Sequence, residues 1–444
     1  MIEGHDILCF APGPWDDIWR NRHQIMTRLA RANRVLYIEP WPELRPTLRK
    51  WRSGQLSWAD VHGPRLRRVQ ENLHVFSPAL WAPRVARFPL SAVADAAYMA
   101  FLRRVLKRLR FEKPILWLFM PETAIFVGRF DEKLVIYHIV DEYAGYSGIS
   151  ATWRPVVQQM EEQLARQADL VFVTSPDLME RKRAFNESIV LVPNAVDYEM
   201  FAAAGRASNA PIPADMADLR PPIAGYVGAI NDKLNLALLL QVALQCARPD
   251  GEAVPRWSFV LVGPVTIQTV EGQRALEALR ALPNVHFLGS KSVAELPRYI
   301  TACSVCLLPY QINDWTKHID SLKLYEYLAC GKPVIATAVP AARRFSQVVT
   351  IVTDPQEGGS ASSARSTYEL EFLSGMNKAL GEDGPALQAA RRQIAAQNTW
   401  EQRVEALSAA IEERLPRRAS PAPPRDAGRS SEGSERRVAR GTDA

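Results

Sequence analysis

Cysteine is scarce in this sequence, with five residues scattered among 444. An odd number of scattered cysteines excludes a disulfide framework and favours a reducing compartment. Cys303 and Cys306 form a CxxC pattern, but no second pair is present to complete a zinc site. Because this pair lies inside the apolar segment TACSVCLLPY, we expect both thiols to lie in a buried strand, and we expect no metal site.

Long apolar runs are also absent. No run approaches the roughly 18 residues of a membrane-spanning helix. The first segment, MIEGHDILCFAPGPWDD, lacks the basic start and the longer apolar stretch of a secretory signal. We therefore expect a cytoplasmic protein.

Acidic side chains are few in one part of the chain. Between Arg20 and Lys113 there are 20 basic and 6 acidic residues, whereas the whole chain has a net charge of only +6. A basic half suits an anionic surface, an anionic substrate or nucleic acid. Because no recognised DNA- or RNA-binding module is present, we expect no nucleic-acid partner.

The chain does contain a regular alternation of short apolar runs and amphipathic segments, and its length predicts two domains. The alternation predicts parallel sheets with helices on both faces. The runs typical of buried strands are 6–10, 34–38, 73–76, 115–119, 134–138, 170–174 and 189–192, then 223–227, 258–262, 285–288, 305–308, 334–336 and 348–352. The clearest helical segments are 19–31, 153–167, 234–246, 272–282 and 293–301.

Composition divides the chain further. We expect a Rossmann-like domain over 1–201, an Ala-, Pro-, Asn- and Asp-rich linker over 202–221, and a second Rossmann-like domain over 222–397. A capping-box pattern that begins at Thr399 predicts a helix over 398–415 that packs back on the domains. The Pro-, Arg-, Ser- and Gly-rich residues 416–444 predict a disordered tail. The expected fold class is α/β, with two doubly wound domains facing across a cleft.

The segment HIDSLKLYEYLACGKPVIAT, residues 318–337, is the most informative. Its spacing predicts a polar turn, a helix with one apolar face, a turn at Gly331 and a buried strand. Ser321, Lys323 and Glu326 fall in the first turns of the helix, whose free N–H groups and dipole suit a phosphate. Lys323 adds a cation, and the Glu326 carboxylate suits a pair of sugar hydroxyls. The same spacing also fits an ordinary helix–turn–strand unit.

These residues resemble those of a known family. The order of elements and the block SLKLYEYLACGKPVIAT resemble GT-B glycosyltransferases of the large, mostly retaining group that uses nucleotide sugars. Within that group the likeness is greatest to bacterial surface-polysaccharide enzymes of the teichuronic-acid type. Supporting segments are WDDIWRNRHQIMTRLA, VIYHIVDEYAGY, VFVTSPDL, LVPNAVDYEMF, YVGAINDKLNLALL and CSVCLLPY. The resemblance implies a GT-B fold, with the acceptor on the first domain and the nucleotide sugar on the second.

The resemblance also implies roles by position. Glu326 matches the family's acidic residue that contacts the nucleotide ribose, where charge-assisted hydrogen bonds are strong. Gly228 lies at the turn where the backbone approaches the diphosphate. We expect Lys233, Lys323 and the N–H groups of Gly228 and Ser321 to stabilise the departing diphosphate. Lys233 also fits a solvated lysine at a helix start.

Two positions depart from the family's pattern. Ala229 stands where the family usually has an arginine, so the expected diphosphate clamp rests on the lysines. His318 stands where the family has a glutamate that contacts the donor sugar, and Asp320 lies close by. Either His318 or Asp320 makes that contact, or the sugar is bound differently, or both residues merely cap the helix.

The first domain offers further candidates. Asp141 follows a predicted strand at its cleft end and is the candidate catalytic carboxylate, with Lys233 and His318 as the other catalytic candidates. Asp16, Arg20 and Arg22 are candidates for an anionic acceptor, or else belong to a solvated polar face. His138 is a candidate acceptor contact, although a lone histidine in an apolar strand is more often a core residue.

The resemblance thus implies a retaining, hexosyltransferase-like enzyme that moves a sugar from a nucleotide-diphosphate sugar to a glycan or lipid-linked glycan. We expect no cofactor and no metal, because lysines and helix ends replace it and the chain has no DxD triplet. Two rivals stay open: a nucleotide-sugar epimerase of the same fold, and a non-catalytic sugar-nucleotide-binding scaffold.

The segment 98–110, YMAFLRRVLKRLR, is basic and amphipathic. It either binds anionic lipid, which would make the protein peripheral on the inner face of the cell membrane, or turns its apolar stripe to the domain core.

Overall fold

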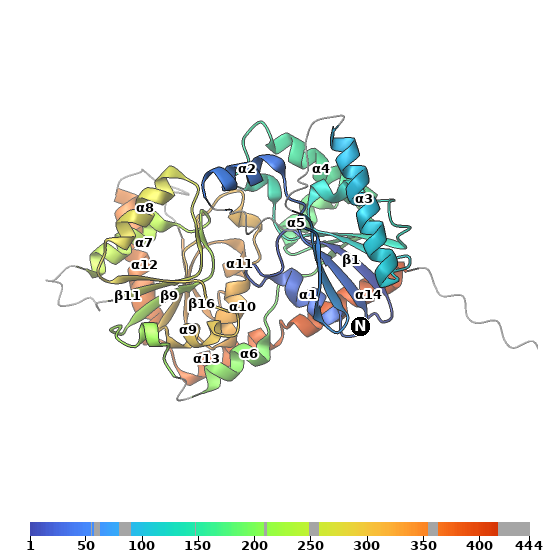
Figure 1. Cartoon of the computed structure of the whole chain (residues 1–444). Coiled ribbons are helices and arrows are strands. Elements are labelled where there is room, and N and C mark those ends of the chain that lie inside the picture. The colour runs from blue at the N-terminus through green and yellow to red at the C-terminus, as the bar shows by residue number, and fades with distance from the viewer. Residues whose placement is uncertain are drawn as a thin grey trace, which may run out of the picture.

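The computed structural model describes residues 1–54, 56, 63–79, 90–146, 148–207, 211–247, 257–353 and 363–415, and the tail predicted for 416–444 lies outside them. Two sheets lie side by side, each flanked by helices, with the N-terminal domain on the right of Figure 1 and the C-terminal domain on the left. Among the described residues, every helix is too short or too polar to cross a bilayer.

The N-terminal sheet has the strand order β3-β4-β2-β1-β5-β6-β7-β8. Its parallel strands are β1 (Asp6–Phe10), β2 (Arg34–Ile38), β4 (Leu73–Ser77), β5 (Ile115–Leu118), β6 (Leu134–Ile139), β7 (Leu170–Val173) and β8 (Ile189–Leu191). They read as continuous apolar runs because helices cover both faces of the sheet. The edge strand β3 (Arg65–Gln70) pairs antiparallel with β4 and is charged and partly exposed.

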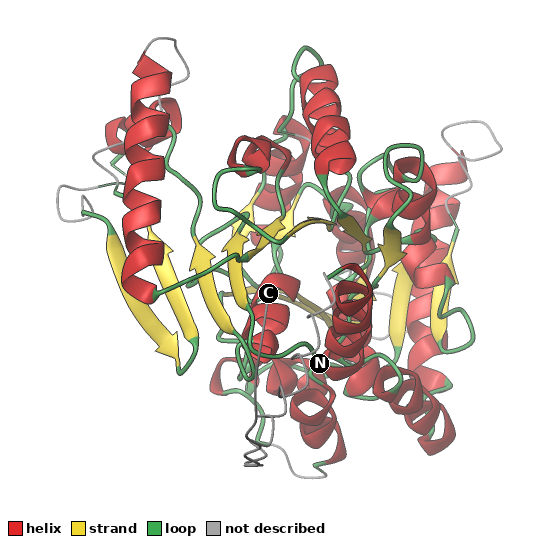
Figure 2. Cartoon of the chain, turned by 90° about the vertical axis from the view of Figure 1, so that its right-hand side faces the viewer, coloured by secondary structure: helices red, strands yellow, loops and turns green. Residues whose placement is uncertain are grey.

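Alternate residues of β1 bury into two separate cores. Ile7 and Cys9 pack beneath α1 (Asn21–Leu29), whereas Leu8 and Phe10 pack on the opposite face. Other helices of this domain are α2 (Leu44–Arg52), α3 (Leu90–Leu109), α4 (Arg154–Gln167) and α5 (Pro176–Lys182). Figure 2 looks from the side of this domain and shows its strands flanked by helices.

Helix α3 turns its apolar stripe inward. Leu102, Val105 and Leu106 are buried in the domain core. The cations Arg103, Arg104, Lys107 and Arg108 point outward and are exposed. The stripe is therefore a core face, which was one of the two alternatives left open by the sequence.

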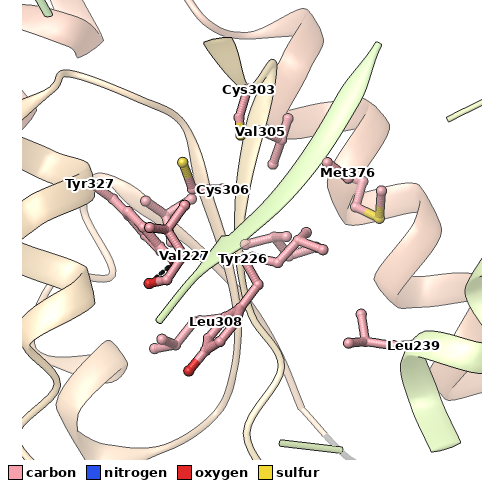
Figure 3. Packing of buried hydrophobic residues seen from close by; sticks show 14 of the residues in the cluster. Tyr226, Val227, Leu239, Cys303, Val305, Cys306, Leu308, Tyr327 and Met376 are labelled. Carbon is pink, nitrogen blue, oxygen red and sulfur yellow. Dashed lines mark hydrogen bonds between the residues drawn. The ribbon is translucent and has the colours of Figure 1, made fainter. Parts of the chain in front are cut away.

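The C-terminal sheet is parallel, in the order β13-β11-β9-β14-β15-β16. Its strands are β9 (Ile223–Val227), β11 (Ser258–Val262), β13 (Val285–Gly289), β14 (Val305–Leu308), β15 (Val334–Thr337) and β16 (Val349–Val352). Two short strands, β10 (Ile230–Asn231) and β12 (Val265–Thr266), pair beside it. Cys303 and Cys306 are both buried, and Figure 3 shows them in this core with Tyr327, whose hydroxyl accepts from the Val227 N–H at 2.9 Å.

The helices of this domain are α7 (Leu236–Cys246), α8 (Val270–Arg280), α9 (Leu296–Ala302), α10 (Leu322–Ala329), α11 (Pro340–Arg343), α12 (Ser363–Gly381) and α13 (Pro385–Ala396). Gly331 follows α10 with a φ of 74°, the left-handed turn expected there. Short 3-10 turns lie at Pro121–Phe126, Tyr143–Gly145, Ala214–Met216 and Thr316–His318.

The chain crosses between the domains earlier than the composition predicts. Helix α6 (Tyr198–Arg206) covers the first residues of the predicted linker 202–221, and Phe201 is buried in the C-terminal core. Asp197 caps this helix, accepting from the Met200 N–H at 3.5 Å, so that AAAGR continues a helix that has already begun. The predicted boundary at 201 is therefore wrong, and the crossing lies at Val196.

The chain returns beside this first crossing. The Val196 N–H donates to the Asn398 carbonyl at 3.0 Å, and the Trp400 N–H donates to the Val196 carbonyl at 3.2 Å. Helix α14 (Trp400–Arg414) then packs on the N-terminal domain, where Trp400, Val404, Leu407 and Ile411 share a core with α1. Two adjacent crossings of extended chain thus join the domains.

Candidate active site

Two cavities of about 460 and 530 Å³ lie between the domains. Their walls come from segments that directly follow strands of both sheets, such as Pro12, Asp141, Gly228 and Tyr310. In open α/β sheets this edge is where ligands bind. We call the cavity that contains Glu326 the inner cavity, and the one that contains Asp141 and Lys233 the outer cavity.

Helix α10 begins at the junction of the two cavities. Ser321 is its N-cap, and Leu322 and Lys323 follow in the cavity wall. Leu324, Tyr325 and Leu328 are buried on the opposite side. The Ser321 Oγ lies 3.2 Å from the Tyr310 hydroxyl rather than capping the helix. The first N–H groups of α10 therefore remain available toward the cleft.

Lys323 lies directly against the turn at Gly228. This glycine has a φ of 151°, and a Cβ there would collide with Lys323 Cε and lie 2.8 Å from its Nζ. The Gly228 N–H donates to the Val262 carbonyl at 2.7 Å, which holds the turn. The missing side chain thus leaves room for an ammonium group, and burial lowers the pKa of Lys323 while Glu326 raises it.

Glu326 lies one turn further along α10 and lines the inner cavity. Burial raises its pKa to about 6, and the positive charge of Lys323 acts in the opposite direction. At neutral pH the carboxylate is ionised, as an acceptor of two hydroxyl hydrogen bonds must be.

Lys233 and Asp141 face each other across the outer cavity from different domains. Burial lowers the pKa of Lys233 to about 7, aided by the charges of Lys323 and Arg20. Its Nζ lies 5.3 Å from the centre of the Tyr310 ring. Burial raises the pKa of Asp141, whose Oδ2 accepts from the Tyr146 hydroxyl at 2.7 Å. The predicted carboxylate and lysine are thus brought together.

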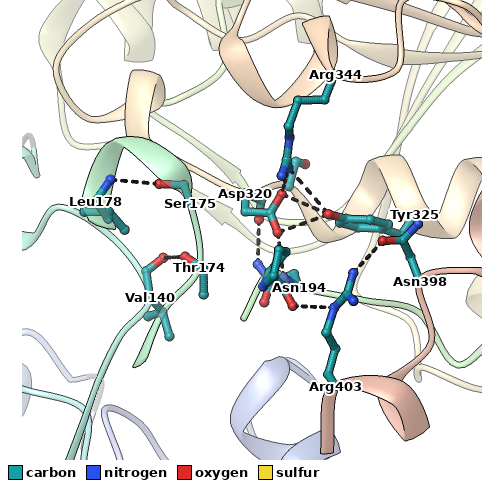
Figure 4. Close-up of polar contacts among 12 residues, drawn as sticks. Val140, Thr174, Ser175, Leu178, Asn194, Asp320, Tyr325, Arg344, Asn398 and Arg403 are labelled. Atoms are coloured by element: carbon teal, nitrogen blue, oxygen red, sulfur yellow. Dashed lines mark hydrogen bonds and ion pairs between the residues drawn. The ribbon is translucent and has the colours of Figure 1, made fainter. Parts of the chain in front are cut away.

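Asp320 is not free to bind a sugar. Its carboxylate accepts from the Asn194 N–H at 2.6 Å, from the Tyr325 hydroxyl at 3.1 Å and from Arg344 (Figure 4). The Asn194 side-chain amide donates to the Asp320 carbonyl at 2.6 Å, and the Arg403 Nε donates to the Pro193 carbonyl at 3.0 Å. Asp320 lines the outer cavity, but the structure does not support the prediction of a donor contact, because the carboxylate oxygens already have these partners and tie α10 to the other domain.

His318 is also turned away from the cleft. Its Nε2 accepts from Arg181 Nη1 on α5 at 2.9 Å, and it lines neither cavity. Burial and the nearby Arg181 charge lower its pKa. The prediction of His318 as a catalytic residue is wrong, because it packs against α5 of the N-terminal domain.

His138 belongs to the core rather than to an acceptor site. Its ring lies 5.9, 5.1 and 5.7 Å from those of Trp117, Phe119 and Phe172, and it is 1% exposed. Burial lowers its pKa to about 3. The imidazole is enclosed by rings and lines neither cavity, so the prediction of His138 as an acceptor contact is wrong.

The three candidates of the first loop differ in their surroundings. Asp16 is exposed, lines the inner cavity and pairs with Arg67 at 2.5 Å. Arg22 lines the outer cavity and is 4% exposed, with its Nε donating to the Tyr37 hydroxyl at 2.8 Å. Arg20, the N-cap of α1, lines both cavities.

Sequence reasoning missed part of the cavity wall. Tyr146 and Trp315 come from different domains, and their rings meet at 5.1 Å in the outer cavity. The loop 290–293 after β13 lines the inner cavity. The rule that ligands lie beyond strand ends, applied to every strand, points to this loop. Tyr146 ends the segment VIYHIVDEYAGY, which supports the resemblance without assigning this residue a role, and nothing in the sequence marks Trp315.

Comparisons with known proteins find a family, a relative and solved structures to which this chain is similar. Residues 221–363 match the family described as glycosyl transferases group 1. The chain is 27% identical over 299 residues to TuaH of Bacillus subtilis strain 168, provisionally named a teichuronic acid biosynthesis glycosyltransferase. That match covers 65% of this chain and 69% of TuaH.

Solved structures share the fold at low identity. Sucrose-phosphate synthase of Thermosynechococcus elongatus matches with a TM-score of 0.60 and 18% identity, over 92% of this chain and 98% of its own. HepE of Anabaena in complex with UDP matches with a TM-score of 0.59 and 13% identity, over 92% of this chain and 100% of its own. The UDP-forming α,α-trehalose-phosphate synthase of Burkholderia vietnamiensis matches with a TM-score of 0.61 and 13% identity, over 93% of this chain and 99% of its own. These likenesses confirm the expected GT-B fold.

Proposed function

Because residues 221–363 match the glycosyl transferases group 1 family, we propose that the chain is a glycosyltransferase that moves a sugar from a nucleotide-diphosphate sugar to a hydroxyl acceptor during polysaccharide assembly. One observation carries the proposal. Lys323 and Glu326 lie one helical turn apart on the cleft side of α10, beside a glycine turn into which no side chain would fit.

The proposed position of the donor in the cleft is based on the order in which these residues lie along it. The nucleoside occupies the inner cavity, where ionised Glu326 accepts hydrogen bonds from both ribose hydroxyls. The diphosphate lies at the start of α10, against Lys323 and the N–H groups there. The sugar extends into the outer cavity toward Lys233 and Asp141.

The leaving diphosphate gains negative charge as the glycosidic bond breaks. Lys323, Lys233 and the α10 dipole stabilise that charge, and each preorganised donor of this kind commonly contributes about 3–4 kcal/mol. These groups do the work of a divalent cation, so we include in the proposal that no metal is needed. Activity that survives EDTA in full agrees with this, and activity restored only by Mg²⁺ or Mn²⁺ contradicts it.

The proposal includes retention of the sugar's anomeric configuration, because the segment 321–337 resembles that of the mostly retaining glycosyltransferases. The alternative is inversion, with Asp141 taking the acceptor proton, and it is favoured by one observation: burial raises the pKa of this carboxyl at the cleft end of β6. Proton NMR of the first product distinguishes retention from inversion, because the coupling constant of the anomeric proton reports the configuration of the anomeric carbon.

The acceptor side of the proposal joins the outer cavity to a surface. A glycan or lipid-linked glycan presents its hydroxyl beside Asp141, and the exposed cations of α3 meet an anionic membrane. Because the apolar stripe of α3 is buried, this contact is electrostatic and salt-sensitive. Flotation with anionic but not neutral vesicles supports it, and absence from both removes it.

One experiment tests the function against its rivals. The protein is incubated with UDP-, GDP-, ADP- and dTDP-sugars, with and without candidate acceptors, and nucleotide release is followed. Free nucleoside diphosphate that depends on acceptor supports a transferase. An isomerised donor indicates an epimerase, and binding without turnover indicates a scaffold. Loss of turnover in Lys233→Ala, with folding intact, is expected; an unchanged rate refutes its role.

A further inference from the structure

The two cavities of the cleft meet at a small set of residues that line both. They come from the loop before α1 and from the opposite domain: Asp17, Ile18, Trp19, Arg20, Ala229, Leu322 and Lys323. Two of them are cations, and each belongs to a different domain. The charge of Asp17 is partly offset, because it lies 3.7 Å from Arg22 Nη2.

This junction is where the proposed donor carries its negative charge. A molecule with its nucleoside in the inner cavity and its sugar in the outer cavity must pass its diphosphate through the shared residues. Lys323 approaches from the C-terminal domain. The position directly after Gly228 is Ala229, which supplies no charge. The remaining cation of the junction is Arg20.

The backbone of Arg20 is fixed by a hydrogen bond, whereas its side chain is exposed. Its N–H donates to His23 Nδ1 at 2.9 Å, and His23 stacks on Trp19 with ring centres 5.0 Å apart. The residue is exposed, and in the part of the chain that the structure describes it forms no ion pair with an acid. The guanidinium is therefore available to an anion that enters the junction.

The charge of Arg20 acts on groups of both domains. Burial is the main reason that the pKa values of Lys233 and Lys323 are lowered, and Arg20 lowers both further. It also opposes the effect of burial on Asp141. Lys233 and Arg20 thus act on the Asp141 carboxylate, and Arg20 also acts on Lys323, so the cations of both domains are close enough to interact and form a positive region that would attract a diphosphate.

We propose that Arg20 binds the diphosphate of the donor, so that the phosphate site is completed by a residue of the N-terminal domain. This inference rests on the proposed function and reassigns Arg20, which the sequence suggested for the acceptor. It makes donor binding depend on how the two domains are apposed, because Lys323 and Arg20 grip the same group from opposite sides. Arginine suits this role because its planar fork donates two parallel hydrogen bonds to phosphate.

The test is calorimetric titration of the full chain with UDP, GDP, ADP and dTDP, followed by repetition of the tightest titration on variants. Arg20→Ala is expected to weaken binding about 10- to 100-fold, the usual loss for a charge-assisted hydrogen bond. Arg20→Lys is expected to recover part of it. Arg31→Ala, which removes the same charge from an exposed position just beyond α1, serves as the control and is expected to bind as wild type does.

Each outcome separates the inference from the function on which it rests. Wild-type affinity in Arg20→Ala overturns the inference alone, and a raised acceptor KM in that variant assigns Arg20 to the acceptor instead. A wild-type chain that binds none of the four diphosphates overturns both. Thermal unfolding of each variant is measured first, and Arg20→Gln replaces the alanine variant if the latter does not fold.

Discussion

At the scale of single residues, the proposed phosphate site depends on the contact between Gly228 and Lys323. A Cβ at position 228 would meet Lys323 Cε, and the φ of 151° is strained for any other residue. Since the colliding atom is the end of a flexible side chain, the lysine is displaced rather than the fold. We expect Gly228→Ala to abolish detectable nucleoside-diphosphate binding while costing only about 1–3 kcal/mol of unfolding free energy.

Calorimetry and urea unfolding measure these two effects separately. Gly289→Ala is the matched control, because Gly289 also has a positive φ, of 70°, but a Cβ there would meet nothing within 4 Å. The control is expected to lose stability and to keep its affinity for nucleotide. Equal affinities in the two variants contradict the role given to the glycine turn.

The buried charges of the site also predict a narrow pH optimum. Burial raises the pKa of Glu326 to about 6, so we expect this carboxylate, the proposed ribose contact, to become protonated and kcat/KM to fall as the pH drops below that value. Burial and neighbouring cations lower the pKa of Lys233 to about 7, so its charge is lost and kcat/KM falls as the pH rises above that value.

The fall in kcat/KM at high pH can be tested directly by replacing Lys233. Arginine does not titrate in this range, so a pH profile of Lys233→Arg is expected to lose the alkaline limb and keep the acid limb. A bound diphosphate stabilises the protonated lysine, and the limb in kcat is therefore expected at higher pH than the limb in kcat/KM. An alkaline limb that persists in Lys233→Arg assigns it to another group.

At the scale of elements, Asp320 fixes the start of α10 to the other domain. Its carboxylate accepts from three donors and its side chain has no exposed area. Asp320→Asn turns an amide toward one of these donors, and we expect a loss of about 1–3 kcal/mol in unfolding free energy. We also expect weaker nucleotide binding, because α10 carries Lys323 and Glu326.

Urea unfolding and calorimetry test this, with Asp314→Asn as the control. The side chain of Asp314 is 77% exposed and pairs only with Lys317, at 3.6 Å, among the described residues. Its loss is expected to cost less than about 0.5 kcal/mol. If the two variants are equally stable, the tie through Asp320 is not a support of the site.

Helix α14 belongs to the N-terminal core although it ends the described chain. Leu407 is fully buried there. We expect Leu407→Ala to cost about 2–5 kcal/mol in unfolding free energy, measured by urea unfolding. Leu370→Ala on α12, where the side chain is 56% exposed, is the control and is expected to change stability by less than about 0.5 kcal/mol. Equal losses would mean that α14 is not part of this core.

The elements differ in how well the sequence predicts them. β1, β2, β9, β11 and β14 are predicted to the residue, because each is an apolar run buried on both faces. β3 escapes prediction because RLRRVQ is a charged edge strand without a clear alternation. α6 escapes it because its alanine-rich end resembles linker composition.

The site shows the same division. Helical spacing alone brings Lys323 and Glu326 to one face of α10, so both are found from the sequence. Spacing does not reveal what lies opposite a residue. The rings around His138 come from neighbouring strands. Asn194, whose N–H donates to the Asp320 carboxylate, lies 126 residues earlier in the sequence. For that reason spacing places His138 and His318 in the cleft incorrectly, and it does not reveal that the carboxylate of Asp320, which lines the outer cavity, already has three partners.

At the scale of the whole molecule, the function depends on two domains that contribute to one cleft. The domains are joined by two extended crossings, paired between Val196 and Thr399. Beside them Asp320 and Asn194 link the start of α10 to the loop after β8. Lys233, Lys323 and Glu326 lie on one domain and Asp141 and Arg20 on the other, so the apposition of the domains sets the geometry of the site.

The most direct test of this account is a crystal structure of the full chain with a bound nucleoside diphosphate. The account predicts that both ribose hydroxyls lie within hydrogen-bond distance of the Glu326 carboxylate, with the diphosphate at the start of α10 in contact with Lys323. A nucleotide bound elsewhere, or in the cleft with its ribose away from Glu326, would contradict it.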